Sequence, residues 1–123
     1  MPPACAPILL VEDDQNVLDI TSFVLESAGY AVLTAMSADE ALATLSHHPE
    51  VGLVLTDVNM PGRLDGIDLV RELHNAGNPV RCVVVSGDAL HACDRLGDLA
   101  PFLAKPYDRR SLLQAVGDAM SPH

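Results

Sequence analysis

The sequence predicts an α/β fold: a doubly wound, five-stranded parallel sheet with helices on both faces. Short aliphatic runs alternate with segments of helical spacing along the chain, which is the pattern of repeated strand–helix units. Four of the aliphatic runs also end on polar residues, as happens where parallel strands finish at one edge of a sheet. The expected strand order is 2-1-3-4-5, and it opens a crevice between the first and third strands.

The first strand is expected at residues 8–11, a short apolar run bounded by turn signals. Apolar residues at helical spacing predict a helix over residues 16–28, which Gly29 ends. Asp14, just before this helix, is interpreted as its cap or as a solvated surface residue. A second strand follows at residues 30–35.

Ser37 and Glu40 have the spacing of a capping box, in which the serine accepts from a helix amide and the glutamate reaches back. A second helix is therefore expected to run to about Ser46, and Pro49 stops it. Residues 51–56 are almost all aliphatic, so this third strand is expected near the centre of the sheet, where both faces are covered.

The third helix is marked by apolar residues at helical spacing, namely Ile67, Val70 and Leu73. The turn at residues 77–79 ends it, and residues 80–85 predict the fourth strand. A short helix is expected over residues 88–96 and a very short fifth strand over residues 102–104. Asp108 is expected to cap a last helix, whose apolar residues are Leu112, Leu113 and Val116.

Composition and charge favour one compact domain, residues 1–123 with a core at 8–118, because 49% of the residues are hydrophobic. A net charge of −10 argues against nonspecific binding to nucleic acid or to an anionic membrane.

Cys5, Cys82 and Cys93 have no CxxC spacing, which favours a reduced, cytoplasmic protein, with Cys82 as a small core residue. No signal peptide or membrane span is expected, and the five histidines are interpreted as surface residues.

Polar residues at the predicted strand ends are the candidate site. The strands are followed by Glu12-Asp13-Asp14, by Asp57, by Ser86 and by Lys105. Because parallel strands end at the same edge, we expect these groups to converge although they lie far apart in the sequence. Carboxylates, a hydroxyl and an ammonium group together suit a hard metal ion and a phosphoryl group.

The chain resembles the receiver domain of bacterial two-component response regulators, which has a flavodoxin-like fold. The matching segments are Leu10–Asp14, Leu55–Pro61, Asp65-Gly66, Val84–Gly87 and Leu103–Pro106. Each segment alone is weak evidence, but their common order and spacing extend over residues 8–118.

The resemblance implies that Asp57 is the phosphoacceptor, since a carboxylate can attack a phosphoryl group and form an acyl phosphate. It also implies a bound Mg²⁺ ion, or Mn²⁺ in its place. Asp13, Asp57 and the main-chain carbonyl of Asn59 would bind the ion directly, and Glu12 would contribute mainly through water.

By the same resemblance, Lys105 and Ser86 contact the phosphoryl oxygens, and Gly87 leaves room for the phosphoryl group. Ser86, Phe102 and Pro106 are the expected switch residues, with Phe102 standing where the family often has Tyr. A cis peptide bond before Pro106 is implied as well, and it would aim Lys105 toward the crevice.

Two segments depart from the commonest family pattern. The loop at residues 60–66 is one residue longer, and the stretch from Ser86 to Lys105 is about three residues shorter. The shorter stretch from Ser86 to Lys105 stands where the family commonly has a long, regular fourth helix. We therefore expect a monomer when the protein is unphosphorylated, and an output surface other than the dimer face of many receivers.

The resulting hypothesis is a stand-alone receiver, or a receiver cut from a longer regulator or hybrid kinase. It would take a phosphoryl group from a sensor histidine kinase or a histidine phosphotransfer protein and signal to a partner protein. A pseudo-receiver that only binds proteins is one alternative. An aspartyl-phosphate phosphatase is another, disfavoured because Asn59 stands where such enzymes carry a second, proton-transferring aspartate. The protein is thus not expected to be an enzyme beyond its own phosphorylation and dephosphorylation.

Overall fold

The computed structural model describes residues 6–60 and 62–120, so the predictions that concern Cys5, Pro61 and His123 lie outside the described residues. Within these ranges the strands are β1 (Ile8–Val11), β2 (Val32–Ala35), β3 (Leu53–Asp57), β4 (Arg81–Ser86) and β5 (Phe102–Ala104). The helices are α1 (Gln15–Ser27), α2 (Ala38–His47), α3 (Gly66–Asn75), α4 (Ala89–Leu96) and α5 (Arg109–Met120). The predicted alternation of strand and helix is confirmed.

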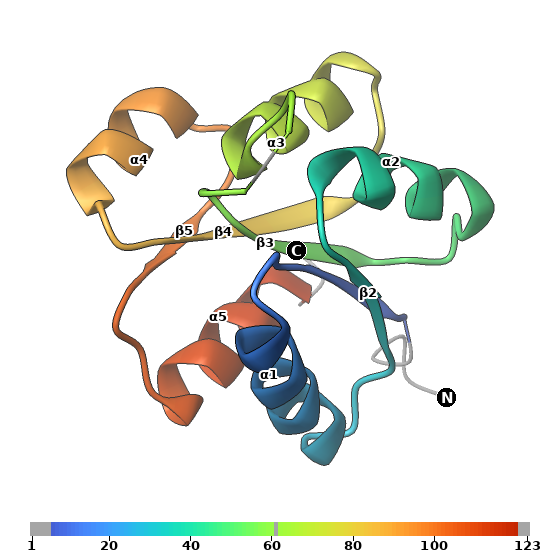
Figure 1. Ribbon diagram of the computed structural model, residues 1–123, viewed down its shortest axis with the longest axis vertical. Coiled ribbons are helices and arrows are strands. Elements are labelled where there is room, and N and C mark those ends of the chain that lie inside the picture. The colour runs from blue at the N-terminus through green and yellow to red at the C-terminus, as the bar shows by residue number, and fades with distance from the viewer. Residues whose placement is uncertain (1–5, 61, 121–123) are drawn as a thin grey trace.

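The strands form one parallel sheet in the order β2-β1-β3-β4-β5, as the sequence predicted (Figure 1). The register aligns the carboxyl ends of neighbouring strands: Val11 pairs with Thr56, Asp57 with Val85, and Ser86 with Ala104. Residues at or just after these ends therefore share one edge of the sheet.

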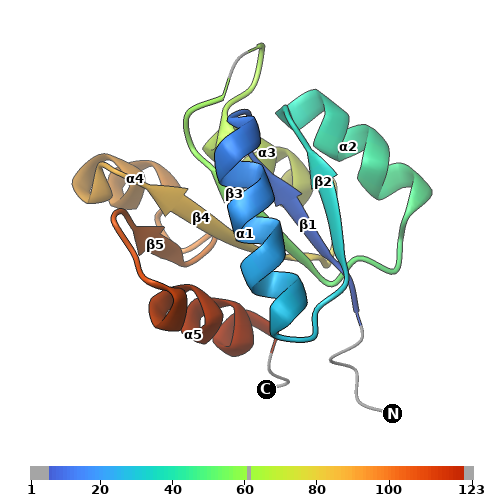
Figure 2. The same cartoon turned by 60° about the horizontal axis from the view of Figure 1, so that its bottom comes forward.

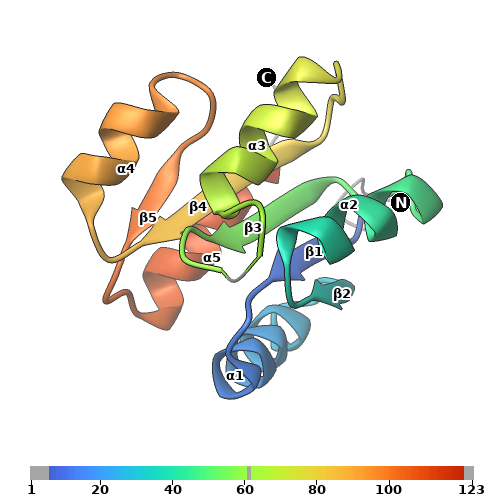
Figure 3. The ribbon, with the colours of Figure 1, turned by 45° about the horizontal axis from the view of Figure 1, so that its top comes forward.

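Helices cover both faces of the sheet. Helices α1 and α5 pack together on one face, and α2, α3 and α4 lie on the other (Figure 1). Figure 2 brings α1 and α5 forward, and Figure 3 brings the opposite layer forward. Alternate residues of β1 face opposite helix layers. Ile8 and Leu10 pack toward α1 and α5. Leu9 and Val11 pack toward α2 and α3.

Three strands differ in their bounds from the prediction, and the smallest difference is at β4, which covers Arg81–Ser86 rather than residues 80–85. Strand β2 begins at Val32 rather than at residue 30, because the Tyr30 N–H donates to Leu25 O (3.1 Å) and so still closes the end of α1. Strand β3 begins at Leu53 rather than at residue 51 and continues through Asp57. All five of its residues are buried, which agrees with its expected central place.

The helix caps follow the predicted chemistry with one correction. Ser37 Oγ accepts from the Glu40 amide (3.1 Å), but Glu40 Oε1 accepts from the Met36 amide (3.0 Å) and not from Ser37. The second half of the predicted capping box was therefore wrong by one residue. A complete capping box occurs instead at α3, between Asp65 and Asp68.

The predictions of surface histidines and of a core Cys82 are met in different degrees. His47, His74 and His91 are exposed as expected, but His48 is only half-exposed and contacts Glu50. Cys82 is mostly buried between core side chains, and burial raises the pKa of its thiol to about 11. No helix among the described residues is both long enough and apolar enough to cross a membrane.

Candidate functional site

The carboxyl edge of the sheet brings together the predicted site residues from separate strands. Glu12 follows β1, Asp57 ends β3, Ser86 ends β4 and Lys105 follows β5. Three of these side chains are buried, since the exposed fractions are 6% for Glu12, 9% for Asp57 and 5% for Ser86. Buried polar groups in this number are unusual for such a small core and mark this edge as the candidate site.

Asp57 and Lys105 form an ion pair, in which Lys105 Nζ donates to Asp57 Oδ2 at 2.9 Å. Burial opposes the charge of Lys105, but the hydrogen bond to Asp57 and the charges of Asp57 and Glu12 outweigh it, so the pKa of Lys105 is raised. The Lys105 amide also donates to Ser86 O (2.8 Å), and the Lys105–Pro106 peptide bond is cis, as the resemblance implied. The ammonium group therefore stays charged beside the Asp57 carboxylate.

Glu12 is the most perturbed acid of the site, with a pKa raised to about 7. Burial is the main cause; the charge of Asp57 and a hydrogen bond with Asp13 add to it, while the Asp14 amide and Lys105 oppose it. Asp13 itself is exposed. Asp14 Oδ1 accepts from the Asn16 amide (2.9 Å) and caps α1, which confirms its interpretation as a cap.

The donor set suits a hard cation that keeps part of its water. It consists of carboxylate oxygens from Glu12, Asp13 and Asp57, with Asn59 exposed on the loop after β3. Among the residues that the structure describes, no three His, Cys, Asp or Glu side chains are close enough to enclose an ion. Mg²⁺ typically takes one or two carboxylates and retains several waters, so it does not require a site enclosed by three protein carboxylates.

The hydroxyl of Ser86 faces its own loop in this structure. Ser86 Oγ donates to Asp88 O (3.0 Å) and accepts from the Asp88 amide (3.0 Å). At Gly87, a Cβ atom built on the backbone would meet no heavy atom within 4 Å, so the space beside this residue is open. The sequence placed Ser86 correctly at the edge, but its present partners were not predicted.

Phe102 is half-buried at the start of β5. It packs against the cluster formed by Val58, Ile67, Val70, Val84, Ala92 and Leu96, between the sheet and helices α3 and α4. Its predicted role in switching stays a prediction.

Two features of the site were missed by the sequence reasoning. Tyr107 lines a small cavity of about 10 Å³ beside Asp57, together with Glu12 and Thr21. Arg95 forms ion pairs with Asp65 and Asp68 at the start of α3. The only sequence signal for Tyr107 is its place two residues after Lys105, and Arg95 had none, because 30 residues separate it from Asp65.

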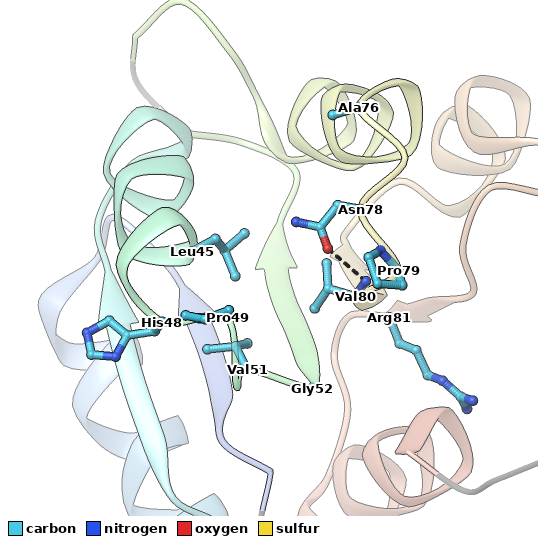
Figure 4. Close-up of a pocket in the computed structure, with 10 residues that line it drawn as sticks. All are labelled: Leu45, His48, Pro49, Val51, Gly52, Ala76, Asn78, Pro79, Val80 and Arg81. Atoms are coloured by element: carbon cyan, nitrogen blue, oxygen red, sulfur yellow. Dashed lines mark hydrogen bonds between the residues drawn. The ribbon is translucent and has the colours of Figure 1, made fainter.

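A pocket of about 540 Å³ lies at the opposite edge of the sheet, where β3 and β4 begin (Figure 4). It is lined by Leu45, His48, Pro49, Val51, Gly52, Ala76, Asn78, Pro79, Val80 and Arg81. Arg81 points away from it and donates to Ala119 O at 2.8 Å. With no acid–base pair facing inward, this pocket offers no chemistry comparable to that at the carboxyl edge.

Acid is expected to destabilise the protein partly through Asp65. Burial raises the pKa of this carboxyl, but hydrogen bonds from Arg95 and the Asp68 amide outweigh burial and hold the pKa below its ordinary value. A depressed pKa stabilises the fold above the unfolded-state pKa, about 4, and that stabilisation is lost as pH falls through the folded-state pKa. In urea unfolding, the stability gap between the protein and Arg95→Gln should therefore shrink in acid. A gap that stays constant with pH would contradict this assignment.

Comparison with known proteins agrees with the geometry. The family model "Response regulator receiver domain" matches residues 8–117. The chain is 37% identical over 120 residues to the transcriptional regulatory protein GlrR of Escherichia coli (strain K12), and it is 34% identical over 119 residues to the transcriptional regulatory protein FixJ of Azorhizobium caulinodans. These matches cover 94% and 93% of this chain but only 26% and 54% of the relatives. A response regulator receiver domain protein from Clostridium thermocellum superimposes with a TM-score of 0.85 at 30% identity, covering 94% of each chain.

Proposed function

This chain belongs to the response regulator receiver domain family, and from that premise we propose that it accepts a phosphoryl group on Asp57 and switches conformation to signal to a partner protein. The donor is a phosphohistidine on a sensor histidine kinase or a histidine phosphotransfer protein. The observation that carries the proposal is the buried Asp57 carboxylate held at 2.9 Å by Lys105, beside further acids, at the carboxyl edge of the sheet.

The reaction is one phosphoryl transfer. A carboxylate oxygen of Asp57 attacks phosphorus, the P–N bond to the donor imidazole breaks with its electron pair leaving on nitrogen, and an acyl phosphate forms. The ammonium group of Lys105 would then contact the negatively charged phosphoryl oxygens, and the Ser86 hydroxyl would donate a hydrogen bond to one of them. The open space beside Gly87 would admit the group.

Asp13, Asp57 and the Asn59 carbonyl would hold a Mg²⁺ or Mn²⁺ ion, with Glu12 reaching it mainly through water. When bound, the cation neutralises charge that builds up on the phosphoryl oxygens during transfer. The clustering of carboxyl groups supports this assignment, because the negative charge of Asp57 helps to raise the pKa of Glu12 and a cation would compensate such charge.

The rest of the proposal concerns partners and setting. We propose a monomeric cytoplasmic switch, with residues 8–118 as the functional unit and Ser86 and Phe102 as its moving parts. GlrR and FixJ are named as transcriptional regulators, but this chain corresponds to only 26% and 54% of their lengths, so DNA binding is not proposed for it. The net charge of −10 also disfavours direct binding to nucleic acid.

Incubation with Mg²⁺ and acetyl phosphate tests the function. Intact-protein mass spectrometry should show the gain of one phosphoryl group, and an excess of chelator added beforehand should prevent it. A pseudo-receiver would gain no mass in either condition. A phosphatase would release phosphate through many turnovers without slowing, which is not expected because Asn59 has no proton to exchange in this pH range.

A further inference from the structure

Thr56 places a hydroxyl group in the core, near the end of an aliphatic strand. Leu53, Val54 and Leu55 precede it in β3, and Thr56 is fully buried, with 0% of its surface exposed. Valine has a similar shape and would bury no polar atom at this position. A buried hydroxyl costs free energy unless it forms a hydrogen bond, so its partner indicates what it does.

The partner of this hydroxyl is the main chain of Asp57. Thr56 Oγ1 donates to Asp57 O at 2.9 Å. The first residue of α3 covers this bond, because a Cβ atom built at Gly66 would overlap the Asp57 main-chain oxygen and would lie 3.0 Å from Thr56 Oγ1. Water therefore cannot easily replace the hydroxyl, and removal of the hydroxyl would take this donor away from a buried carbonyl oxygen.

The side chain of Thr56 lies on the opposite face of the sheet from the Asp57 carboxylate. Successive residues of a strand point to opposite faces. Leu55 belongs to the core cluster beside α1 and α5, and Val54 belongs to the cluster beside α2 and α3. Asp57 therefore shares the face of Leu55, and Thr56 shares the face of Val54. Any effect of the hydroxyl on chemistry at the carboxylate must pass through the main chain.

Two main-chain bonds complete the hold on this end of β3. The Val58 amide donates to Val85 O at 3.1 Å, and the Gly66 amide donates to Val58 O at 2.8 Å. Together with the Thr56 hydroxyl, they fix the main chain at Asp57 and directly after it, and the main chain sets the direction in which the carboxylate points. Of these three bonds, the one from Thr56 is made by a side chain, so a substitution can remove it.

We propose that Thr56 is a positioning residue for phosphoryl transfer, whose hydroxyl holds the Asp57 carbonyl group and thereby aims the Asp57 carboxylate. The aim matters because the carboxylate must both meet Lys105 Nζ, at 2.9 Å, and attack phosphorus in line. A displacement of about 1 Å can slow a reaction about a hundredfold. The effect on transfer rests on the proposed function of Asp57, whereas the bond from the hydroxyl to the Asp57 main chain does not.

Three substitutions separate positioning from stability. Thr56→Val removes the hydroxyl and keeps the shape, so the saturating rate of labelling by acetyl phosphate with Mg²⁺ should fall about tenfold. The half-saturating concentration of acetyl phosphate should change by less than about twofold, because Lys105 and Ser86 are retained. Thr56→Ser keeps the hydroxyl and should label within about twofold of the original rate. Val54→Ala, the matched control, removes buried methyl groups from the same face of β3 and should lower stability in urea without slowing labelling.

An unchanged saturating rate in Thr56→Val, with stability alone reduced, would assign Thr56 a purely structural role and overturn the proposal. Equal slowing in Val54→Ala would overturn it as well. If Thr56→Val does not fold, Thr56→Ala is compared with Thr56→Ser instead. These two variants differ by one oxygen atom, and the same difference in rate is expected between them.

A measurement without phosphorylation separates this proposal from the proposed function. The carbon NMR signal of the Asp57 side-chain carboxyl group should move in Thr56→Val and return to its original position in Thr56→Ser. If the original protein gains no label but this signal behaves as expected, the proposed function fails and the positioning of Asp57 by Thr56 is retained. If the signal does not move in Thr56→Val, the positioning proposal is wrong whether or not the original protein is labelled.

Discussion

Replacing Asp57 with asparagine is expected to abolish labelling by acetyl phosphate in the presence of Mg²⁺. The amide of asparagine carries no negative charge and is a poor nucleophile, so the acyl phosphate cannot form at that position. Mass spectrometry of the intact variant should show no gain of a phosphoryl group under conditions that label the original protein completely. Peptide mapping of the labelled original protein should place the group on Asp57.

The matched control for this substitution is Asp118→Asn. Asp118 is exposed on α5 and accepts from Gln114 Nε2 (3.0 Å), so its replacement removes one carboxylate without touching the site. This control should label as the original protein does. Asp57→Asn should also remain folded by circular dichroism, because it removes one charge from a crowded acidic site. Persistent labelling of Asp57→Asn would place the acceptor on another acid, with Asp13 the first to examine.

Replacing Gly66 with alanine is expected to destabilise the protein by about 3 kcal/mol. A Cβ atom at this position would overlap the main-chain oxygen of Asp57 and approach Thr56 Oγ1 at 3.0 Å. Main-chain atoms of a buried central strand cannot give way as a flexible side chain can, so the start of α3 must move off β3. Urea unfolding followed by circular dichroism measures the loss, and labelling of Asp57 should fall with it because the acceptor loop shifts.

Gly117 provides the matched control for Gly66. It lies within α5, and a Cβ atom built there meets no heavy atom within 4 Å. Gly117→Ala should therefore stabilise the protein by about 0.5 to 1 kcal/mol, because alanine loses less conformational freedom than glycine in a helix. The two glycine-to-alanine changes should thus have opposite signs. Equal effects would show that the contact between α3 and β3 does not require glycine.

Much of the fold could be predicted because its signals are local. The strand at Ile8–Val11 and the short strand at Phe102–Ala104 have the predicted bounds, and α4 was expected over nearly its observed range. Ser37 was predicted as a helix cap from its neighbours alone, and Asp14 as a cap or a solvated surface residue. Strand order followed from the alternation of elements, because right-handed crossovers leave few ways to build a parallel sheet.

The gathering of Asp57, Ser86 and Lys105 at one edge was also predictable, since it depends only on where the strands end. What each side chain does at that edge depended on the tertiary structure. Ser86 bonds Asp88 rather than the acceptor, and the pKa of Glu12 is raised by burial, neither of which has a signature in the chain.

The periodicity of apolar residues, the caps and the turn residues thus determined the elements, their order and the edge at which the polar groups meet. Folding in three dimensions decided the pairing of Arg95 with Asp65 across 30 positions and the contact of Gly66 with the Asp57 carbonyl. The physical reason is the distance along the sequence over which each effect acts. Propensity and spacing act over a few neighbouring residues, whereas ion pairs, burial and close backbone contacts depend on which distant segments the packed layers bring together.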